Sequence, residues 1–288
     1  MKKNVLFAGL FLLILFAADC FARANDFKTK KYVFNVRSNK TLVVKLDIDI
    51  SSDFRIRPNK ESKQVIVEIN YNPEKMDVDT DFNAKNNRLF VSMDVNSWKG
   101  GFSYDEDAGE CTIYFPLDVP IDLDSRCKAG QINFDLGGLS LKNVSLNLAA
   151  GTARIRFRKP NPVVMEDLEI NGKVGELDLE NLGNSRFKIG NISAGIGELS
   201  VDLSGDKPVQ FSQDLNIDVK IGETNLTLPK KRPIKLRVNK ILFLTQSDIP
   251  AGFERHGSYL TTGDVEGAKN LLYLRISPGF GALNIDWE

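Results

Sequence analysis

Short runs in which apolar and polar residues alternate fill most of the chain from Lys31 to Phe115. Examples are residues 32–36 (Tyr-Val-Phe-Asn-Val) and 65–69 (Val-Ile-Val-Glu-Ile), and Asn, Asp, Gly and Pro separate the runs. A period of two places alternate side chains on opposite faces of a β-strand. The first stretch with a helical period, residues 264–270, is interrupted by Gly267. The pattern predicts an all-β fold.

A seven-residue pattern, in which glycine is followed by alternating polar and apolar positions, begins at Gly130 and occurs six times. Successive glycines are 21, 24, 22 and 25 residues apart, with 59 residues before the last. A spacing of about 23 residues is typical of one coil of a β-solenoid. The six glycines are Gly130, Gly151, Gly175, Gly197, Gly222 and Gly281.

These repeats predict how the chain is organised. Residues 119–288 are expected to form a C-terminal β-solenoid, a single-stranded or parallel β-helix in which each coil supplies two or three short strands. Residues 25–118 are expected to form an N-terminal β region that starts the same stack. Because alternate strand residues face opposite ways, the apolar positions two, four and six after each glycine should point inward. The glycines suit corners that need a positive φ or a close approach of neighbouring coils.

Charged residues occupy the outward positions of two consecutive copies. Opposite charges across a ladder contribute roughly 0.2–1 kcal/mol per pair and help to fix the register. We therefore expect a structural role for Arg154, Arg156 and Arg158, which lie one coil from Glu176, Asp178 and Glu180.

The N-terminus has the pattern of a secretory signal. Lys2 and Lys3 precede an apolar run of 14 residues, Val5 to Ala18, and residues 22–24 read Ala-Arg-Ala. We expect residues 1–24 to be removed, so that the chain is exported to the periplasm, the cell surface or the medium. No later run approaches the roughly 20 apolar residues that a transmembrane helix needs. An alternative is a lipoprotein anchor at Cys20, although Asp19 stands where a small uncharged residue is usual.

Composition narrows the possible functions. The 288 residues contain 38 Lys+Arg and 38 Asp+Glu, so no net field attracts nucleic acid, and no nucleic-acid partner is expected. The chain has one histidine, His256, which excludes multi-histidine metal sites. Glu254, Ser258 and Tyr259 are its neighbours, but no Gly-x-Ser-x-Gly elbow occurs, so a loop histidine is the preferred interpretation. We expect no enzymatic activity and no cofactor.

Two cysteines would remain after signal removal. Cys111 and Cys127 lie in strand-like runs on either side of residues 116–120 (Pro-Leu-Asp-Val-Pro), and they would face each other if those runs formed a hairpin centred on Val119. A disulfide between them is therefore possible in an exported protein, and two separate thiols are the alternative.

Glutamates follow the glycines of three consecutive copies. Glu176, Glu198 and Glu223 would form a column spaced by about 4.8 Å in a regular solenoid. A hard cation such as Ca²⁺ could neutralise them, which makes them weak metal-site candidates. The alternative is that they extend into solvent.

Several segments resemble a known family. Residues 113–123 (Ile-Tyr-Phe-Pro-Leu-Asp-Val-Pro-Ile-Asp-Leu), the following Ala129-Gly130-Gln131-Ile132 and the repeated Gly-x-Leu-x-Val strands resemble bacterial toast-rack and LiaF-like C-terminal domains, as well as adhesin-type β-solenoids. Residues 219–229 are similar to their Gly-Glu-x-x-Leu-x-Leu-Pro element. The resemblance is strongest from Val119 to Glu288. It implies an extracytoplasmic domain without known catalysis, involved in envelope stress sensing or adhesion. LiaF-like proteins carry transmembrane helices before this domain, whereas only a cleavable signal is expected before it in this chain.

Three functional hypotheses follow. The first is a non-enzymatic, envelope-associated scaffold or adhesin-like module that binds an envelope protein or a surface glycan. The second is an accessory protein of an envelope stress response. The third is a glycan-binding or glycan-active β-helix, for which the acidic run Asp105, Glu106 and Asp107 is a candidate. The basic run from Pro229 to Pro233 is expected to be a solvated turn.

Overall fold

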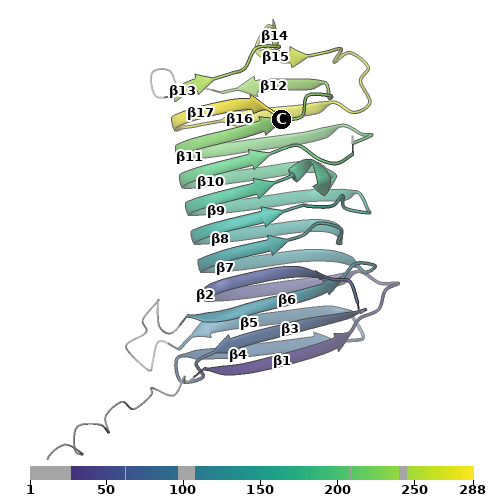
Figure 1. Cartoon of the computed structure of the whole chain (residues 1–288), viewed down its shortest axis with the longest axis vertical. Helices are drawn as coiled ribbons and strands as arrows, with labels where there is room; N and C mark the ends of the chain where they lie inside the picture. The colour runs from purple at the N-terminus through teal and green to yellow at the C-terminus, as the bar shows by residue number, and fades with distance from the viewer. Residues whose placement is uncertain (1–26, 62, 97–107, 208, 240–244) are drawn as a thin grey trace, which may run out of the picture.

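A stack of β-strands runs along the long axis of the molecule (Figure 1). The computed structural model describes residues 27–61, 63–96, 108–207, 209–239 and 245–288. Their regular structure consists of seventeen strands and one short 3-10 helix, η2 (Leu182–Ser185). Over these residues no helix is long and apolar enough to cross a membrane. The expected signal, Cys20 and the acidic run at 105–107 lie outside the described residues.

Five long strands form the regular part of the stack. Each is 16 or 17 residues long, and consecutive strands pair in parallel with glycine opposite glycine. They are β7 (Pro120–Asp135), β8 (Ser140–Arg156), β9 (Met165–Glu180), β10 (Phe187–Asp202) and β11 (Gln213–Leu228). Each coil is thus a single bent strand and a loop, not the two or three short strands expected from sequence. The reason is that the corner glycine, with φ of +117° to +143° in these five strands, turns the backbone while pairing continues on both sides.

Each bent strand has a first arm before the glycine and a second arm after it. Inward side chains of the two arms meet in one continuous hydrophobic core. The expected inward positions are confirmed, because Ile132, Phe134 and Leu136 and their counterparts Ala153, Ile155 and Phe157 are all buried. Burial of such side chains contributes roughly 1.5–3 kcal/mol each, and most of it requires a neighbouring coil.

The N-terminal strands begin the same stack. Strand β2 (Leu42–Asn59) pairs with β7 on one side, and on the other with β5 (Arg88–Val95) along its first half and β6 (Gly109–Pro116) along its second. β4 (Met76–Asn83) then ends the first-arm sheet beyond β5. β3 (Gln64–Tyr71) and β1 (Lys28–Asn35) end the second-arm sheet beyond β6. The all-β, toast-rack-like solenoid expected from sequence is confirmed.

The 59-residue gap before the last glycine has a structural explanation. β16 (Leu272–Ser277) and β17 (Phe280–Trp287) pair directly with the two arms of β11, so Gly281 stacks on Gly222. The intervening strands lie on the far side of this coil. They are β12 (Ile234–Val238), β13 (Thr245–Asp248), β14 (Glu254–His256) and β15 (Tyr259–Thr262).

Candidate functional site

The glycine corner brings neighbouring coils unusually close together. The six repeat glycines lie in one column, with φ between +117° and +143°. A Cβ atom on Gly222 would lie 1.7 Å from the carbonyl oxygen of Gly197. The dual expectation of a positive φ and a close approach is therefore confirmed. Because the backbone turns here, the residue before each glycine is directed away from the core.

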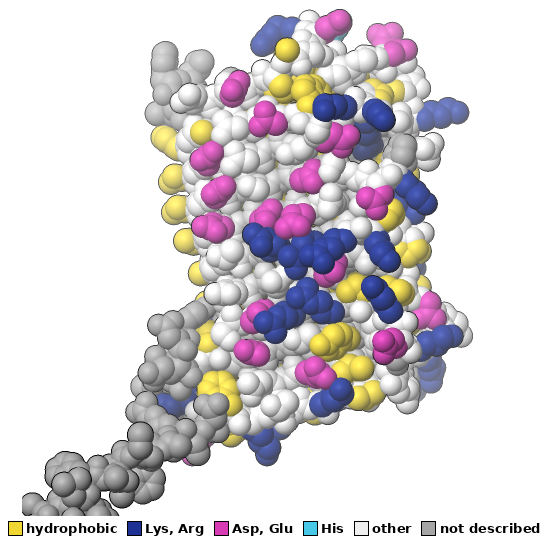
Figure 2. Space-filling view, viewed as in Figure 1, with side chains coloured by type: hydrophobic (Ala, Val, Ile, Leu, Met, Phe, Trp, Pro, Cys, Tyr) yellow, Lys and Arg dark blue, Asp and Glu magenta, His cyan; other side chains and the backbone are white. Residues whose placement is uncertain are grey.

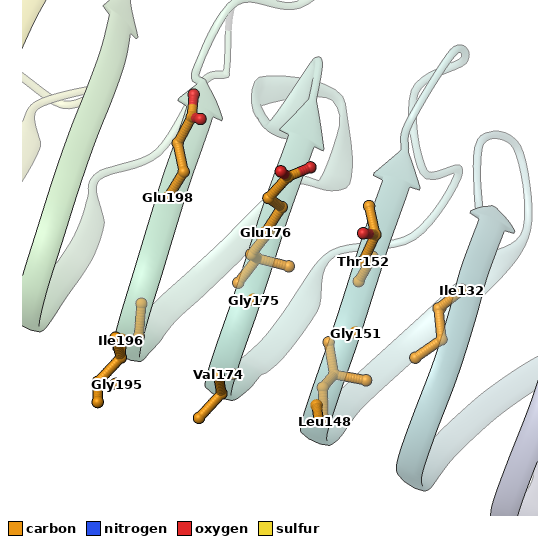
Figure 3. Close-up of a pocket in the computed structure, with 15 residues that line it drawn as sticks. Ile132, Leu148, Gly151, Thr152, Val174, Gly175, Glu176, Gly195, Ile196 and Glu198 are labelled. Carbon is orange, nitrogen blue, oxygen red and sulfur yellow. The ribbon is translucent and has the colours of Figure 1, made fainter. Parts of the chain in front are cut away.

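Those preceding residues form an exposed apolar column, here called the corner ridge. It consists of Val174, Ile196, Ile221 and Phe280, which are direct partners across successive coils. Their exposed fractions are 54%, 53%, 49% and 49%, and they are four of the seven exposed large apolar residues in the described part of the chain. Yellow side chains project one above another from the left edge in Figure 2, and Figure 3 labels Val174 and Ile196 at the bends of their strands.

Charged residues follow both flanks of the ridge. Glu176, Glu198 and Glu223 are register partners, so the expected glutamate column is present and its residues are exposed. On the other flank Lys173 and Lys220, each two residues before a repeat glycine, are also exposed. The ridge is thus an apolar line between an acidic flank and a basic flank.

The glutamate column does not have the geometry of a metal site. The Asn225 side-chain amide donates to Glu198 Oε1 (3.2 Å), and that of Asn284 donates to Glu223 Oε1 (2.8 Å). Among the described residues no group of three His, Cys, Asp or Glu side chains is arranged to hold an ion. The carboxylates instead extend the polar ladder of the second arm, and the metal hypothesis has no support in this geometry.

A small pocket lies at the corner, where inward-facing side chains of the two arms come together (Figure 3). Its lining includes Leu148, Gly172, Leu177 and Ala194, and its volume is about 20 Å³. That is room for about one water molecule. This pocket is therefore too small for a ligand larger than water.

The expected charge ladder is only partly present. Arg154 Nε lies 2.9 Å from Asp178 Oδ2 and 3.3 Å from Glu180 Oε1. Arg158 instead contacts Asp135 at 3.8 Å on the preceding coil, and Arg156 donates to the side chain of Asn133. The register partners of Arg156 are Asp135 and Glu180, but its side-chain hydrogen bond is to Asn133.

Cys111 and Cys127 are buried free thiols. The hairpin that would pair them is wrong, because β6 and β7 flank β2 on opposite sides and both run parallel to it. Strands two positions apart are separated by about 9.6 Å, beyond the roughly 7 Å Cα separation that a disulfide spans. Burial raises the pKa of the Cys127 thiol to about 12 and that of Cys111 further.

His256 lies at the C-terminal end of the stack. Its side chain is 65% exposed, and Nε2 is 3.6 Å from Glu254 Oε2. It lines a cavity of about 370 Å³ with Lys235, Tyr259 and Tyr273. The ammonium of Lys235 lies 4.4 Å from the centre of the Tyr259 ring. Among the hydrogen bonds of the described residues, none joins His256 to a serine or threonine hydroxyl, so the geometry assembles no relay.

The basic run at 229–233 is not simply a solvated turn, as the sequence suggested. The Arg232 guanidinium donates to the carbonyl oxygens of Asn270 (2.6 Å), Phe211 (3.1 Å) and Leu271 (3.2 Å) and to the side chain of Gln213. Burial lowers the pKa of Arg232 to about 10. Its neighbours Lys230 and Lys231 are exposed, as expected.

A larger groove of about 740 Å³ runs along the loop side of the solenoid. Leu117, Pro160 and Val209 contribute apolar surface, and basic residues Lys159, Arg186 and Lys207 line it without any acidic residue. Lys159 and Lys207 form no ion pair with the described residues. The charged residues of the groove are all basic, whereas the face shown in Figure 2 carries both acidic and basic residues.

Sequence comparison finds a family that is similar to the N-terminal part of the chain. Residues 23–163 match the family described as the N-terminal domain of toast_rack, DUF2154. This part of the chain is similar to the toast-rack family. The toast-rack match lies further towards the N-terminus than the resemblance we noted, which was strongest after Val119. It covers β1 to β8 and includes the first two repeat glycines.

Three solved structures align with most of the chain at low sequence identity. A proposed cell adhesion protein from Clostridium sporogenes ATCC 15579 is 19% identical, and the alignment covers 91% of this chain and 100% of that chain, with a TM-score of 0.44. A proposed adhesin from Bacteroides fragilis NCTC 9343 is 10% identical. Its alignment covers 90% of this chain and 97% of that chain, with a TM-score of 0.38. A proposed lipid-binding protein from Parabacteroides distasonis ATCC 8503 is 12% identical. Its alignment covers 92% of this chain and 98% of that chain, with a TM-score of 0.40. No curated protein matches the chain.

Sequence reasoning missed the corner ridge, although a signal for it exists. The residue before the repeat glycine is apolar in all six copies, from Ala129 to Phe280. In a straight strand this position would share a face with the inward residues of the first arm, as Val174 would with Leu168 and Ile170. The positive-φ turn breaks this alternation and directs the side chains before the glycines outward.

Proposed function

We propose that this chain is an exported, non-enzymatic and adhesin-like scaffold that binds another macromolecule through its corner ridge. The observation that carries the proposal is the exposed in-register column of Val174, Ile196, Ile221 and Phe280. A line that gathers four of the seven exposed large apolar side chains of the described residues is typical of an interaction site.

The physical properties of the ridge favour a protein partner. Its backbone is held by pairing on both sides, so little conformational entropy is lost when a partner binds. Completing the burial of four half-exposed side chains contributes about 1 kcal/mol for each. Phe280 is its single aromatic residue, whereas glycan sites usually present several rings for stacking against sugars.

Export and an envelope location rest on the N-terminal signal pattern. The family match begins at residue 23, two residues before the expected start of the mature chain at residue 25. We therefore place the mature chain outside the cytoplasm, with an envelope protein as the proposed partner. A role as an accessory of an envelope stress response would add a change in abundance or partner binding upon cell-wall damage.

The test is a pull-down from envelope extracts with residues 25–288 as bait. Ile196→Asp should abolish capture of the partner. Ile189→Asp is a matched control, because Ile189 lies on the same strand and is 49% exposed but is outside the ridge. Equal capture by both variants would contradict the proposal.

The loop groove favours a second candidate function, the binding of an acidic glycan. The specific observation is a groove of about 740 Å³ with three basic residues and no acidic one. Lys159→Glu and Lys207→Glu together should weaken binding of polygalacturonate. Lys142→Glu, a change at an exposed position outside the groove, is the control. Loss of binding in the control alone, or no binding by the parent, would exclude this function.

A further inference from the structure

We infer that the partner of the corner ridge is a second copy of this chain, bound side by side with both solenoids pointing in the same direction. The inference rests on the proposed role of the ridge as a binding surface. It adds the identity of the partner and the orientation of the pair, and both follow from the arrangement of charges around the ridge.

The two flanks carry opposite charges at the same levels of the stack. Lys173 and Glu176 belong to one coil and lie on opposite sides of Val174. Lys220 and Glu223 are placed in the same way around Ile221. All four residues are exposed, and the side chains of Lys173, Lys220 and Glu176 form no hydrogen bond or ion pair with the described residues. Glu223 accepts one bond from Asn284, which leaves its other oxygen free to bind.

Symmetry distinguishes the two ways in which such ridges can meet. A twofold axis along the ridge keeps the solenoids parallel and exchanges their flanks, so each lysine faces the glutamate of the same coil in the partner copy. A twofold axis across the ridge makes the solenoids antiparallel and places lysine opposite lysine and glutamate opposite glutamate. Like charges in contact are unfavourable, and complementary flanks select the parallel arrangement.

The size of the ridge sets the strength of the interaction. The register column continues below Val174 through Ala150 and Ala129 to Ile50, so it has seven levels. Seven levels span about 29 Å, and a contact strip about 12 Å wide buries roughly 700 Å² in total, below the approximately 1,200 Å² of a stable interface. The pair is therefore weak in dilute solution and forms where chains are concentrated, as on a surface. Parallel pairing suits chains held on the same surface.

Disulfide trapping detects a weak pair and reports its orientation. Val174→Cys, Ile196→Cys and Ile221→Cys are prepared separately in residues 25–288 and oxidised at about 100 µM. In a parallel pair every ridge residue faces its own copy, so all three variants should give covalent dimers. In an antiparallel pair at most one ridge position lies on the twofold axis, so at most one variant would cross-link. Ile189→Cys, exposed but outside the ridge, measures random collision.

Charge exchange tests the flanks independently. Glu176→Lys with Glu223→Lys should lower the cross-linking yield of Ile196→Cys about tenfold, since every complementary pair becomes a like-charge pair. Adding Lys173→Glu and Lys220→Glu should restore the yield. An antiparallel pair would show neither effect, because its facing charges stay alike. Circular dichroism of each variant checks that the stack is retained.

The outcomes separate the two proposals. Cross-linking of no more than one ridge cysteine, or yields no higher than that of Ile189→Cys, would overturn parallel self-association. If Ile196→Asp still abolished capture from envelope extracts in that case, the ridge would be a binding surface for a different protein. If the ridge substitutions affected neither experiment, both proposals would fail.

Discussion

A Cβ atom on Gly197 would lie 1.8 Å from the carbonyl oxygen of Gly175, one coil below. No rotation of a side chain relieves this contact, because the oxygen belongs to the backbone and a Cβ position is fixed by its own backbone. The close approach thus makes glycine necessary at the corner for steric reasons in addition to its φ of +141°. The same contact recurs along the column and determines where each coil bends.

The first prediction concerns this contact. Gly197→Ala should destabilise the protein by at least 3 kcal/mol, because the clash forces two coils apart. Gly263→Ala is the control: Gly263 also has a positive φ, +65°, but a methyl group at this position would meet nothing within 4 Å. The control should cost about 1 kcal/mol, the conformational penalty alone. Chemical denaturation of both variants measures the difference, and similar losses would show that the corner tolerates a side chain.

The second prediction tests the register of the second arm. Leu199 is fully buried between its partners Leu177 and Thr224. Leu199→Asp should cost at least 4 kcal/mol, because an unpaired carboxylate is buried and apolar contacts are lost. Gln131→Asp introduces the same carboxylate at an exposed outward position and should change stability by less than about 0.5 kcal/mol. Equal midpoints in thermal melts would contradict the inward assignment of Leu199.

Much of the fold was predictable because it depends on local patterns. Alternation along one strand, as in Ile132, Phe134 and Leu136, fixes which side chains are inward whatever the strand pairs with. The spacing of the glycines then fixes the length of a coil. The pairing partners of Cys111 could not be predicted, because β6 reaches β2 after an excursion through three other strands. Because Cys111 is close to Cys127 in sequence, a hairpin of β6 with β7 was expected. In the structure both strands pair with β2 instead.

The candidate site was less predictable than the fold. The glutamate column followed from the repeat and was found in place, but the role suggested for it was not supported. An apolar residue stands on the other side of the glycine from each glutamate, as Val174 does from Glu176. In the sequence it looked like one more core residue of the repeat. Only the turn at Gly175, with φ of +125°, directs that side chain outward. The glycine of each repeat predicted the corner, but the direction of the side chain before it became clear only from the stacked coils.

The third prediction follows from the buried thiols. Burial raises the folded-state pKa of Cys127 from 9.0 to about 12, and that of Cys111 in the same direction. A raised pKa means that the unfolded chain loses these protons first, so stability is full below pH 9 and falls as the pH rises towards the folded-state pKa. At pH 10 the loss should be about 1.4 kcal/mol per thiol.

The measurement is urea denaturation between pH 7.5 and 10. The double variant Cys111→Ala and Cys127→Ala should be less stable at pH 7.5, because two buried side chains are shortened. Its stability should then decline less steeply with pH than that of the parent. Parallel curves for the two proteins would mean that the thiols ionise in the folded state as readily as in the unfolded chain.

The fourth prediction distinguishes two adjacent basic residues. Arg232→Ala should destabilise by about 3 kcal/mol, because three backbone carbonyls and the side chain of Gln213 lose their donor in a buried setting. Lys231→Ala, at an exposed position of the same turn, should change stability by less than about 0.5 kcal/mol. Differential scanning calorimetry of the two variants measures their melting temperatures. A larger loss of stability for Lys231→Ala than for Arg232→Ala would contradict the structural role of Arg232.

The last prediction concerns the dependence of each coil on the next. A chain that stops after Ser204 lacks β11 to β17 and leaves both arms of β10 as an unpaired edge. The parallel partners Leu215, Ile217 and Leu226 that cover this edge are removed with it, so backbone donors and acceptors and the end of the hydrophobic core become exposed. An uncovered edge of this kind is a template for pairing with another chain. The truncated protein should therefore aggregate in sedimentation experiments at concentrations where the full chain does not.

His256→Ala in the full chain is the control. It alters only an exposed side chain at the C-terminal end of the stack and should leave sedimentation unchanged. A truncated chain that stayed monomeric and unfolded cooperatively would mean that the first four glycine repeats form an independent unit, and that stacking by β11 is not needed to cover them.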